Sequence, residues 1–260
     1  MNRIEKTFAA LKRPALVSFI TAGDPDRETS QAVLDALPEA GADIIELGMP
    51  FSDPMADGPV IQAASGRALQ AGADMKQTLS MVQQFREKND DTPIVLMGYF
   101  NPVLAYGVQQ FAKDASAAGV DGMIIVDLPP EEDEELQTAA KANGLDIIRL
   151  ITPTTDESRL KTLLNGASGF LYYVSITGVT GTASANMDKL KPHIVEIKKH
   201  TKLPIVIGFG IKTPDDAAAM GQIGDAVVVG SSIVQTIENN DKNTAAGAVS
   251  EQVKALSEAL

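Results

Sequence analysis

The sequence predicts an α/β protein, a single-domain (β/α)8 TIM barrel spanning residues 1–260. Its length lies in the range that such barrels fill as one domain. Eight short runs rich in β-branched residues recur along it, and most are continuously apolar, as expected of parallel strands buried on both faces. Helical stretches separate the runs, and no linker or shift of composition divides the chain. The pattern is therefore that of consecutive βα units.

The eight runs are the predicted strands. They are Ala15–Thr21, Ile44–Leu47, Ile94–Met97, Met123–Val126, Ile147–Ile151, Phe170–Val174, Ile205–Ile207 and Ala226–Val229. Eight strands favour a closed barrel over an open doubly wound sheet, which usually has fewer strands and often carries a G-x-G-x-x-G turn. The first run is followed by Ala22-Gly23-Asp24-Pro25, which lacks that glycine pattern.

Helix signals appear between the runs. Thr213-Pro214-Asp215-Asp216 offers a cap, a proline for the first turn and acids that suit the helix dipole. Pro129 and Pro130, followed by Glu131, predict a helix that begins at either proline. The long interval after the second run is expected to hold an extended Pro-rich loop and an additional helix.

Composition limits the classes of function. The net charge of −12 disfavours nucleic acids and anionic membranes, and no apolar stretch approaches the ~18 residues that cross a bilayer. Residues 1–11 place Ile4, Phe8 and Leu11 at helical spacing, which predicts an extra N-terminal amphipathic helix rather than a signal peptide. With no cysteine and two histidines, the chain offers no disulfide, thiolate ligand or histidine cluster. We expect a cytoplasmic protein without a metal site.

Two carboxylates near the end of the second run are the catalytic candidates, since barrels carry their chemistry at the C-terminal ends of strands. Glu46 lies among aliphatic residues there, where burial raises a carboxyl pKa and suits it to act as acid and base. A structural glutamate satisfied by an arginine or by amides is the alternative. Asp57 lies in the following loop with Asp53, and either aspartate could simply form a turn. Paired with Glu46, a loop carboxylate suits a reaction with two proton transfers.

Three glycine-containing segments of the later units indicate a phosphate site. They are Gly178-Val179-Thr180-Gly181, Gly208-Phe209-Gly210 and Gly230-Ser231-Ser232. Glycine lets backbone N–H groups approach an anion, a helix N-terminus adds partial positive charge, and barrels often bind phosphate after strands seven and eight. Each segment alone could be an ordinary turn. Together they predict that backbone amides bind a phosphate in this acidic protein.

Further polar and aromatic residues fall on the same rim. Tyr99, Phe100 and Phe19 could line an apolar slot for an aromatic group, although core packing is the commoner role, above all for Phe19. Asp127 could bind a substrate or cap the helix predicted to follow it, and Tyr172 lies within the sixth run. None of the runs carries a lysine for a Schiff base. Metal-free acid–base chemistry on a phosphorylated substrate remains, as C–C cleavage, isomerisation or ring closure.

Residues 45–58, IELGMPFSDPMADG, resemble the signature of the tryptophan synthase alpha subunit family. Residues 175–181, 208–211 and 229–231 extend the resemblance over essentially the whole chain, in order. The resemblance implies a (β/α)8 lyase of tryptophan biosynthesis that cleaves indole-3-glycerol phosphate to indole and glyceraldehyde 3-phosphate. It also implies that this subunit uses no cofactor, and that indole passes to a PLP-dependent beta subunit within an αββα heterotetramer.

The resemblance also implies roles residue by residue. Glu46 matches the glutamate that protonates C3 of the indole ring and handles the glycerol hydroxyl proton, and Asp57 matches the aspartate that contacts the indole N–H. The resemblance places Phe19 and Tyr99 at the indole and Tyr172 at the glycerol part of the substrate. It places Thr180 on a loop that closes over the site, where the threonine contacts the aspartate. The matches at the phosphate are Gly181, Gly210, Gly230 and Ser231, and those at the beta subunit are Asp53 and Pro54.

One departure and three alternatives accompany this assignment. After Gly181 the loop lacks the arginine that many relatives place there, which concerns loop closure rather than the carboxylates. The alternatives are a stand-alone indole-releasing lyase, another phosphate-binding barrel of tryptophan or histidine biosynthesis, and a non-catalytic regulatory subunit. The presence of both carboxylates and the lack of a strand-end lysine favour the alpha subunit.

Overall fold

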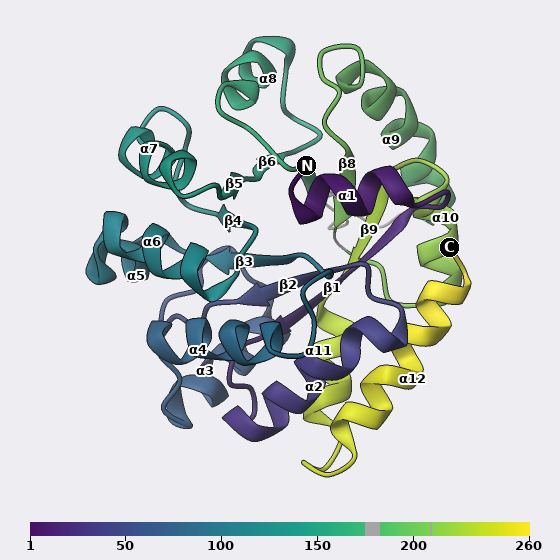
Figure 1. The fold of residues 1–260 in the computed structure, drawn as a ribbon. Helices are drawn as coiled ribbons and strands as arrows, with labels where there is room; N and C mark the ends of the chain where they lie inside the picture. Colours follow the sequence, from purple (N-terminus) through teal and green to yellow (C-terminus); the bar gives the residue numbers. More distant parts are fainter. Residues whose placement is uncertain (175–182, 209) are drawn as a thin grey trace.

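The computed structural model describes residues 1–174, 183–208 and 210–260, without the side chains of residues 183–189. Within these residues, nine parallel strands form a barrel that helices cover from outside (Figure 1). The strands are β1 (Ala15–Thr21), β2 (Ile44–Gly48), β3 (Ile94–Gly98), β4 (Gly122–Ile125), β5 (Asp146–Ile147), β6 (Arg149–Ile151), β7 (Leu171–Val174), β8 (Ile205–Gly208) and β9 (Ala226–Val229). They are hydrogen-bonded in the order β5-β4-β3-β2-β1-β9-β8-β7-β6, which confirms the predicted barrel.

The fifth predicted run forms two short strands instead of one. β5 pairs with β4 through Gly122 and Met123, whereas β6 pairs with β7. Ile148 lies between them, and its N–H donates to the Met123 carbonyl at 3.0 Å. One continuous segment therefore touches both neighbours, and the barrel keeps eight positions around its circumference.

Most of the described helices cover the outside of the barrel. They are α1 (Arg3–Ala10), α2 (Arg27–Ala40), α3 (Pro59–Gln70), α4 (Met75–Arg86), α5 (Phe100–Tyr106), α6 (Val108–Ala118), α7 (Glu134–Ala142), α8 (Glu157–Leu164), α9 (Ala183–Ile197), α10 (Pro214–Gly221), α11 (Ser231–Glu238) and α12 (Ala245–Glu258). The N-terminal helix and the long loop with an extra helix after β2 are as predicted. α10 begins at Pro214, with the predicted cap at Thr213.

The helix after β4 begins later than predicted. α7 starts at Glu134, whereas a start at Pro129 or Pro130 was expected, and residues 130–132 form turns and a bend. Asp133, directly before the helix, is buried and its carboxylate pairs with Arg149 of β6. This buried ion pair holds the segment against the barrel wall, so a tertiary contact decides where α7 begins.

Successive strand side chains point alternately into the barrel and towards the helices. The inward set includes Ala15, Val17, Ile44, Val95, Ile124, Ile148, Phe170, Tyr172, Val206 and Val228. Ile4 and Phe8 of α1, with Leu11 directly after it, pack against this set. α1 therefore closes the N-terminal opening of the barrel, and Figure 1 shows it lying across that opening. The closed end leaves the opposite, C-terminal rim for a substrate.

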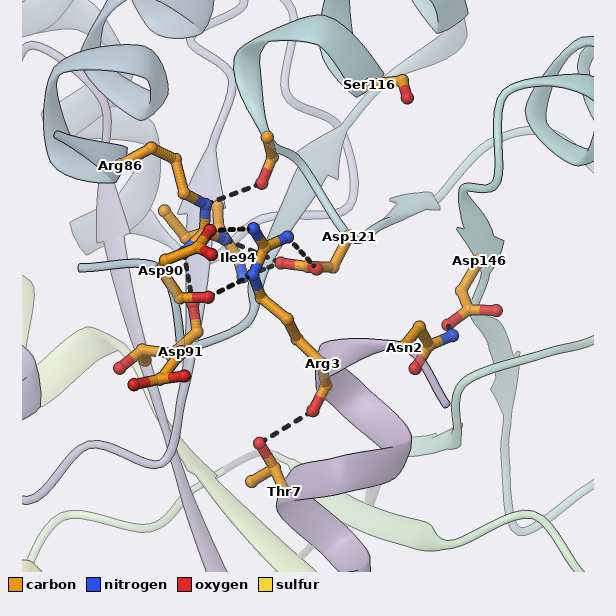
Figure 2. Close-up of polar contacts among 12 residues, drawn as sticks. Asn2, Arg3, Thr7, Arg86, Asp90, Asp91, Ile94, Ser116, Asp121 and Asp146 are labelled. Carbon is orange, nitrogen blue, oxygen red and sulfur yellow. Dashed lines mark hydrogen bonds and ion pairs between the residues drawn. The ribbon is translucent and has the colours of Figure 1, made fainter.

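A set of aspartates fastens the N-terminal end. Asp43, Asp121 and Asp225 each precede a strand and accept a hydrogen bond from the backbone N–H of a neighbouring strand, at 2.7, 2.8 and 2.8 Å. Asp121 also pairs with Arg3 of α1 at 3.0 Å and with Arg86 of α4 at 2.7 Å (Figure 2). These contacts join α1, α4 and the strand starts into one cross-linked end.

Candidate active site

Glu46 extends from β2 into the barrel near its C-terminal rim. In the sheet it lies between Phe19 of β1 and Val95 of β3. The residue is 0% exposed, and neither carboxylate oxygen has a hydrogen-bond partner among the described residues, so no arginine there makes it a structural ion pair. Burial raises the pKa of Glu46 to about 8. Glu46 is therefore mostly protonated at neutral pH, and it can both give a proton and take one back.

Asp57 is held by a tyrosine from the neighbouring strand. The hydroxyl of Tyr99, directly after β3, donates to Asp57 Oδ2 at 2.9 Å and accepts from the Ala56 N–H at 2.9 Å. Burial raises the pKa of the half-buried Asp57, and the hydrogen bond from Tyr99 opposes that rise. Gln62 of α3 donates to the Asp57 carbonyl at 2.8 Å. One hydroxyl thus orders both the loop backbone and its carboxylate.

Tyr172 brings the two carboxylates into one site. It lies on β7 and is almost fully buried, which is the main cause of its raised pKa; the charges of Glu46 and Asp57 raise the pKa further. Tyr172 therefore feels the charge of both carboxyl groups, one on β2 and one on the loop that follows it. Gly208 of β8 leaves room for the tyrosine ring, because a Cβ at this position would lie 2.2 Å from the Tyr172 hydroxyl.

A narrow apolar pocket adjoins Asp57. Its lining is mostly apolar and comes from β1, β2, β3, α3 and the residue after β4: Phe19, Thr21, Gly48, Met49, Ile61, Ser65, Met97, Gly98, Tyr99 and Val126. Gly48 is needed at this spot, since a Cβ there would lie 2.7 Å from the Phe19 ring. The lining is chemically suited to a planar apolar group with one polar edge near Asp57, but the free volume is only about 10 Å³, so such a group enters only when lining side chains move. Phe19 also packs against Ala64 and Val234, so this side chain belongs both to the core and to the pocket lining.

Three of the predicted phosphate residues lie at described positions. Gly230 precedes α11, Ser231 is the exposed first residue of that helix, and Gly210 is exposed with φ of +80°. The first turn of a helix has N–H groups without intrahelical partners and carries partial positive charge, which suits a phosphate. A Cβ at Gly230 would lie 3.3 Å from Phe19 Cβ, so the start of α11 adjoins the apolar pocket.

Two other predicted site residues, Asp53 and Pro54, do not join the carboxylate pair. Asp53 is exposed and accepts a hydrogen bond from the Ser52 hydroxyl at 2.6 Å, and Pro54 is half-buried beside it. Thr180 and Gly181 lie outside the described residues, so their roles stay predictions.

Asp127 caps a helix, but not the predicted one. Its Oδ1 accepts from the Phe100 N–H at 2.8 Å, at the start of α5, whereas the sequence indicated the helix after β4. The carboxyl ends of adjacent parallel strands meet at one rim, which brings the end of β4 beside the helix that follows β3. Phe100 packs on the outer core, which is the packing role that the sequence left open for it, and it does not line the apolar pocket.

Some polar residues of this region escape the sequence analysis. Thr21 and Ser65 line the apolar pocket, and the buried Thr21 hydroxyl has no hydrogen-bond partner among the described residues. Asp24 forms a buried ion pair with Arg67. A threonine or serine within a strand or helix belongs to no sequence pattern that marks it as a pocket residue. For Thr21, its position at the end of the first predicted strand was the one available signal that it lies near the site.

The described part of the chain has neither a cluster of metal ligands nor a membrane-spanning helix. It contains no group of three or more His, Asp or Glu side chains placed to hold a metal ion. None of its helices is both long and apolar enough to cross a membrane. The chemistry at the rim is that of carboxyl groups, tyrosine hydroxyls and backbone amides.

Comparisons with known proteins agree on one family. The sequence model of the family described as tryptophan synthase alpha chain matches residues 6–260. A tryptophan synthase alpha chain from Granulibacter bethesdensis is 54% identical over 268 residues, which cover 100% of this chain and 96% of that protein.

Solved structures give the same result. The tryptophan synthase alpha chain of Legionella pneumophila superposes with a TM-score of 0.91 at 40% identity, covering 100% of this chain and 97% of that chain. A chain of the tryptophan synthase complex of Pyrococcus furiosus superposes with a TM-score of 0.84 at 34% identity, covering 95% and 99% of the two chains.

Proposed function

Because this chain belongs to the tryptophan synthase alpha chain family, we propose that Glu46 and Asp57 carry out the reaction of that family. The enzyme is a lyase that cleaves indole-3-glycerol phosphate to indole and glyceraldehyde 3-phosphate in tryptophan biosynthesis. Its partner is the tryptophan synthase beta subunit. One observation carries the residue assignment. The buried Glu46 carboxyl has no hydrogen-bond partner among the described residues, and the charges of Glu46 and Asp57 both act on Tyr172.

Glu46 acts first as an acid and then as a base. Its carboxyl, held in the protonated form by a pKa of about 8, gives its proton to C3 of the indole ring. The ring thereby becomes an electron sink. The Glu46 carboxylate then takes the proton of the hydroxyl on the carbon attached to C3. As the bond between these carbons breaks, its electron pair returns to the ring, the aldehyde forms and Glu46 is again protonated.

Asp57 serves the nitrogen of the same ring. Protonation at C3 places positive charge on the ring nitrogen, and the Asp57 carboxylate stabilises it by accepting the N–H hydrogen bond or its proton. When the electron pair returns to the ring, the neutral N–H is restored. The hydrogen bond from Tyr99 at 2.9 Å opposes protonation of Asp57 and so keeps this acceptor available.

The remaining rim residues bind the two ends of the substrate. The apolar pocket with Phe19 and Tyr99 takes the indole, and Tyr172 contacts the glycerol. Backbone amides of Gly181, Gly210, Gly230 and Ser231, with the Ser231 hydroxyl, are proposed to bind the phosphate. The family resemblance implies that Thr180 belongs to the loop that closes over the substrate, and Asp127 is proposed to contact the substrate. Because carboxyl groups of this chain supply every proton transfer, we assign it no cofactor; PLP belongs to the beta subunit.

The loop after β2 faces the partner. Asp53 and Pro54, which the family resemblance places at the beta subunit, precede Met55, which is 83% exposed. The same loop carries Asp57, so partner binding and catalysis share one segment. We propose that indole passes from this side to the beta subunit within an αββα assembly, that residues 1–260 form one domain, and that the enzyme works in the cytoplasm.

The test is release of glyceraldehyde 3-phosphate from indole-3-glycerol phosphate, with and without the beta subunit. Slow turnover that rises strongly with the partner is expected, as is loss of turnover in Glu46→Gln with inorganic phosphate still bound. Fast turnover without the partner would support a stand-alone lyase instead. Binding without turnover in both conditions would support a regulatory subunit.

A further inference from the structure

Arg67 joins three elements around the proposed substrate pocket. It lies in α3, and its Nε and Nη2 donate to the two carboxylate oxygens of Asp24 at 2.7 and 2.9 Å. Its Nη1 donates to Glu238 Oε1 at 2.7 Å. One guanidinium thus connects α3 with the loop after β1 and with the C-terminal end of α11.

Each of these elements also carries a part of the proposed site. The loop with Asp24 follows β1, which supplies Phe19 to the apolar pocket. α3 continues directly from the loop with Asp57 and supplies Ile61 to the same pocket. α11 begins at Ser231, at the proposed phosphate end. The three elements that meet at the guanidinium therefore also surround the substrate.

The Asp24 contact is the strong one of the two. The Asp24 side chain is 0% exposed, whereas that of Glu238 is 42% exposed. Loss of Arg67 would leave a buried carboxylate without its counter-charge, which is strongly unfavourable, while an exposed pair contributes little. Gly23, beside Asp24, has a φ of +81°, and a Cβ there would lie 2.9 Å from Ala73 Cβ, in the link between α3 and α4, and 3.8 Å from Ala68 Cβ of α3. The loop thus packs against α3 and the link after it, as well as pairing with Arg67.

We propose that Arg67 is a positioning residue for the lyase reaction: by fixing α3 against the loop after β1, it sets where the Asp57 carboxylate lies relative to the indole ring. This inference rests on the proposed roles of Asp57 and of the apolar pocket. Arg67 does not line that pocket, so it acts through other residues. Asp57 is separated from the start of α3 at Pro59 by one residue, so a shift of the helix is passed directly to the carboxylate.

The phosphate end is expected to respond much less. Glu238 and Ser231 are at opposite ends of α11. α11 packs against α3 through Ala64 and Val234, but it also packs against β1 and α12, so these two elements hold it in place without the exposed pair to Arg67. Substitution of Arg67 therefore weakens the indole end of the site while it leaves the phosphate end intact. A general loss of folding would weaken both ends together.

The experiment compares Arg67→Met with Arg13→Met. Arg13 makes a similar two-bond pair with Asp43, at 2.8 and 3.1 Å, at the N-terminal end of the barrel, so it controls for the loss of an arginine–aspartate pair as such. For each full-length variant we would measure kcat and KM with the beta subunit, the inhibition constant of inorganic phosphate, and unfolding in urea. Indole binding is followed on the chain alone, where the absence of tryptophan lets indole fluorescence report only the ligand.

In Arg67→Met, kcat is expected to fall by about 10- to 100-fold, because a misplacement of about 1 Å has effects of this size. Indole binding should weaken by about fivefold or more while the phosphate inhibition constant stays within about twofold, and Arg13→Met should change neither, as expected of distant sites. Arg67→Lys keeps the charge but loses the two-bond geometry, and it should recover part of kcat. If Arg67→Met does not fold, Arg67→Lys against Arg13→Lys carries the same comparison.

Two results would overturn the proposal. One is a folded Arg67→Met with unchanged kcat and unchanged indole binding. The other is an equal loss of indole and phosphate binding that follows the loss of stability and is matched by Arg13→Met. Failure of the proposed function would give a different result. The unaltered chain would then release no glyceraldehyde 3-phosphate, or Glu46→Gln would retain turnover.

Discussion

Glu46→Gln is expected to stabilise the protein while it removes activity. The carboxyl of Glu46 is completely buried, and its oxygens have no hydrogen-bond partner among the described residues. In the unfolded chain the same carboxyl is in water and ionises freely. Ionisation therefore favours the unfolded state, and a glutamine of the same shape, which cannot ionise, escapes this effect.

The size of the effect follows from the two pKa values. The pKa of Glu46 rises from 4.5 to about 8 on folding, and the group is 0% exposed, so screening by solvent needs no correction. Each pKa unit corresponds to ~1.4 kcal/mol, and at pH 7 the unfolded carboxyl lies ~2.5 units above its own pKa while the folded one is still mostly protonated. The cost of Glu46 at pH 7 is therefore about 3 kcal/mol.

The sign of the pH dependence is fixed by the direction of the shift. For an acid with a raised folded pKa, the stability contributed by the protonated form is fully present below about pH 4.5 and is lost as the pH rises towards 8. The advantage of Glu46→Gln should thus be small near pH 4.5 and should grow by ~1.4 kcal/mol per pH unit up to about pH 8. The amide adds an offset that does not depend on pH, so the slope is the test.

Urea unfolding of both proteins between pH 5 and 8 measures this slope, and turnover of indole-3-glycerol phosphate measures the activity. Turnover is expected to fall by at least about 100-fold, as for the loss of a general acid–base group. A stability difference that does not change with pH would refute the reasoning, because Glu46 would then have an ordinary pKa in the folded protein. A variant that is less stable at every pH would show that the carboxyl serves the fold.

Three further substitutions test other parts of the site. Asp57→Asn should lower kcat by at least about 100-fold with little change in urea unfolding, and a parallel loss of stability would contradict a role confined to the loop. Tyr99→Phe removes the hydrogen bond that opposes the rise of the Asp57 pKa, so the acid limb of the kcat/KM profile should move to higher pH; an unmoved limb would show that Tyr99 does not tune Asp57. Gly208→Ala should displace Tyr172, since the new Cβ would lie 2.2 Å from its hydroxyl, and should lower turnover. Gly247→Ala, where a Cβ meets nothing within 4 Å, is the control that should keep it.

Local sequence signals predicted the barrel well because they depend on short-range pattern. A run of β-branched residues without polar alternation is a strand buried on both faces wherever it occurs, and capping signals such as Thr213 before Pro214 act within one turn. Where the prediction failed, a contact between distant residues decided the outcome. α7 begins at Glu134 because Asp133 is drawn into a buried pair with Arg149.

The candidate site divides in the same way. The sequence shows Glu46 near the end of a predicted strand, among aliphatic neighbours. That position also predicts the direction in which its pKa is shifted, which is upward. The Tyr99 hydroxyl that holds Asp57 lies 42 residues away along the chain, and the pair of Arg67 with Asp24 spans 43 residues. Nothing in the local pattern around these residues indicates which partner each one finds.

The sequence by itself therefore determined the number of βα units, the buried strands, and the rim on which the carboxylates fall, since each depends on periodicity and on neighbours a few residues apart. Only the tertiary structure decided that Asp127 caps α5, that Tyr99 orders the loop of Asp57, and that Arg67 joins three elements around the pocket. The physical reason is that barrel closure brings together the ends of strands that are far apart in the chain. Hydrogen bonds and ion pairs there depend on distances of a few tenths of an ångström, which register and packing set and which no local pattern encodes.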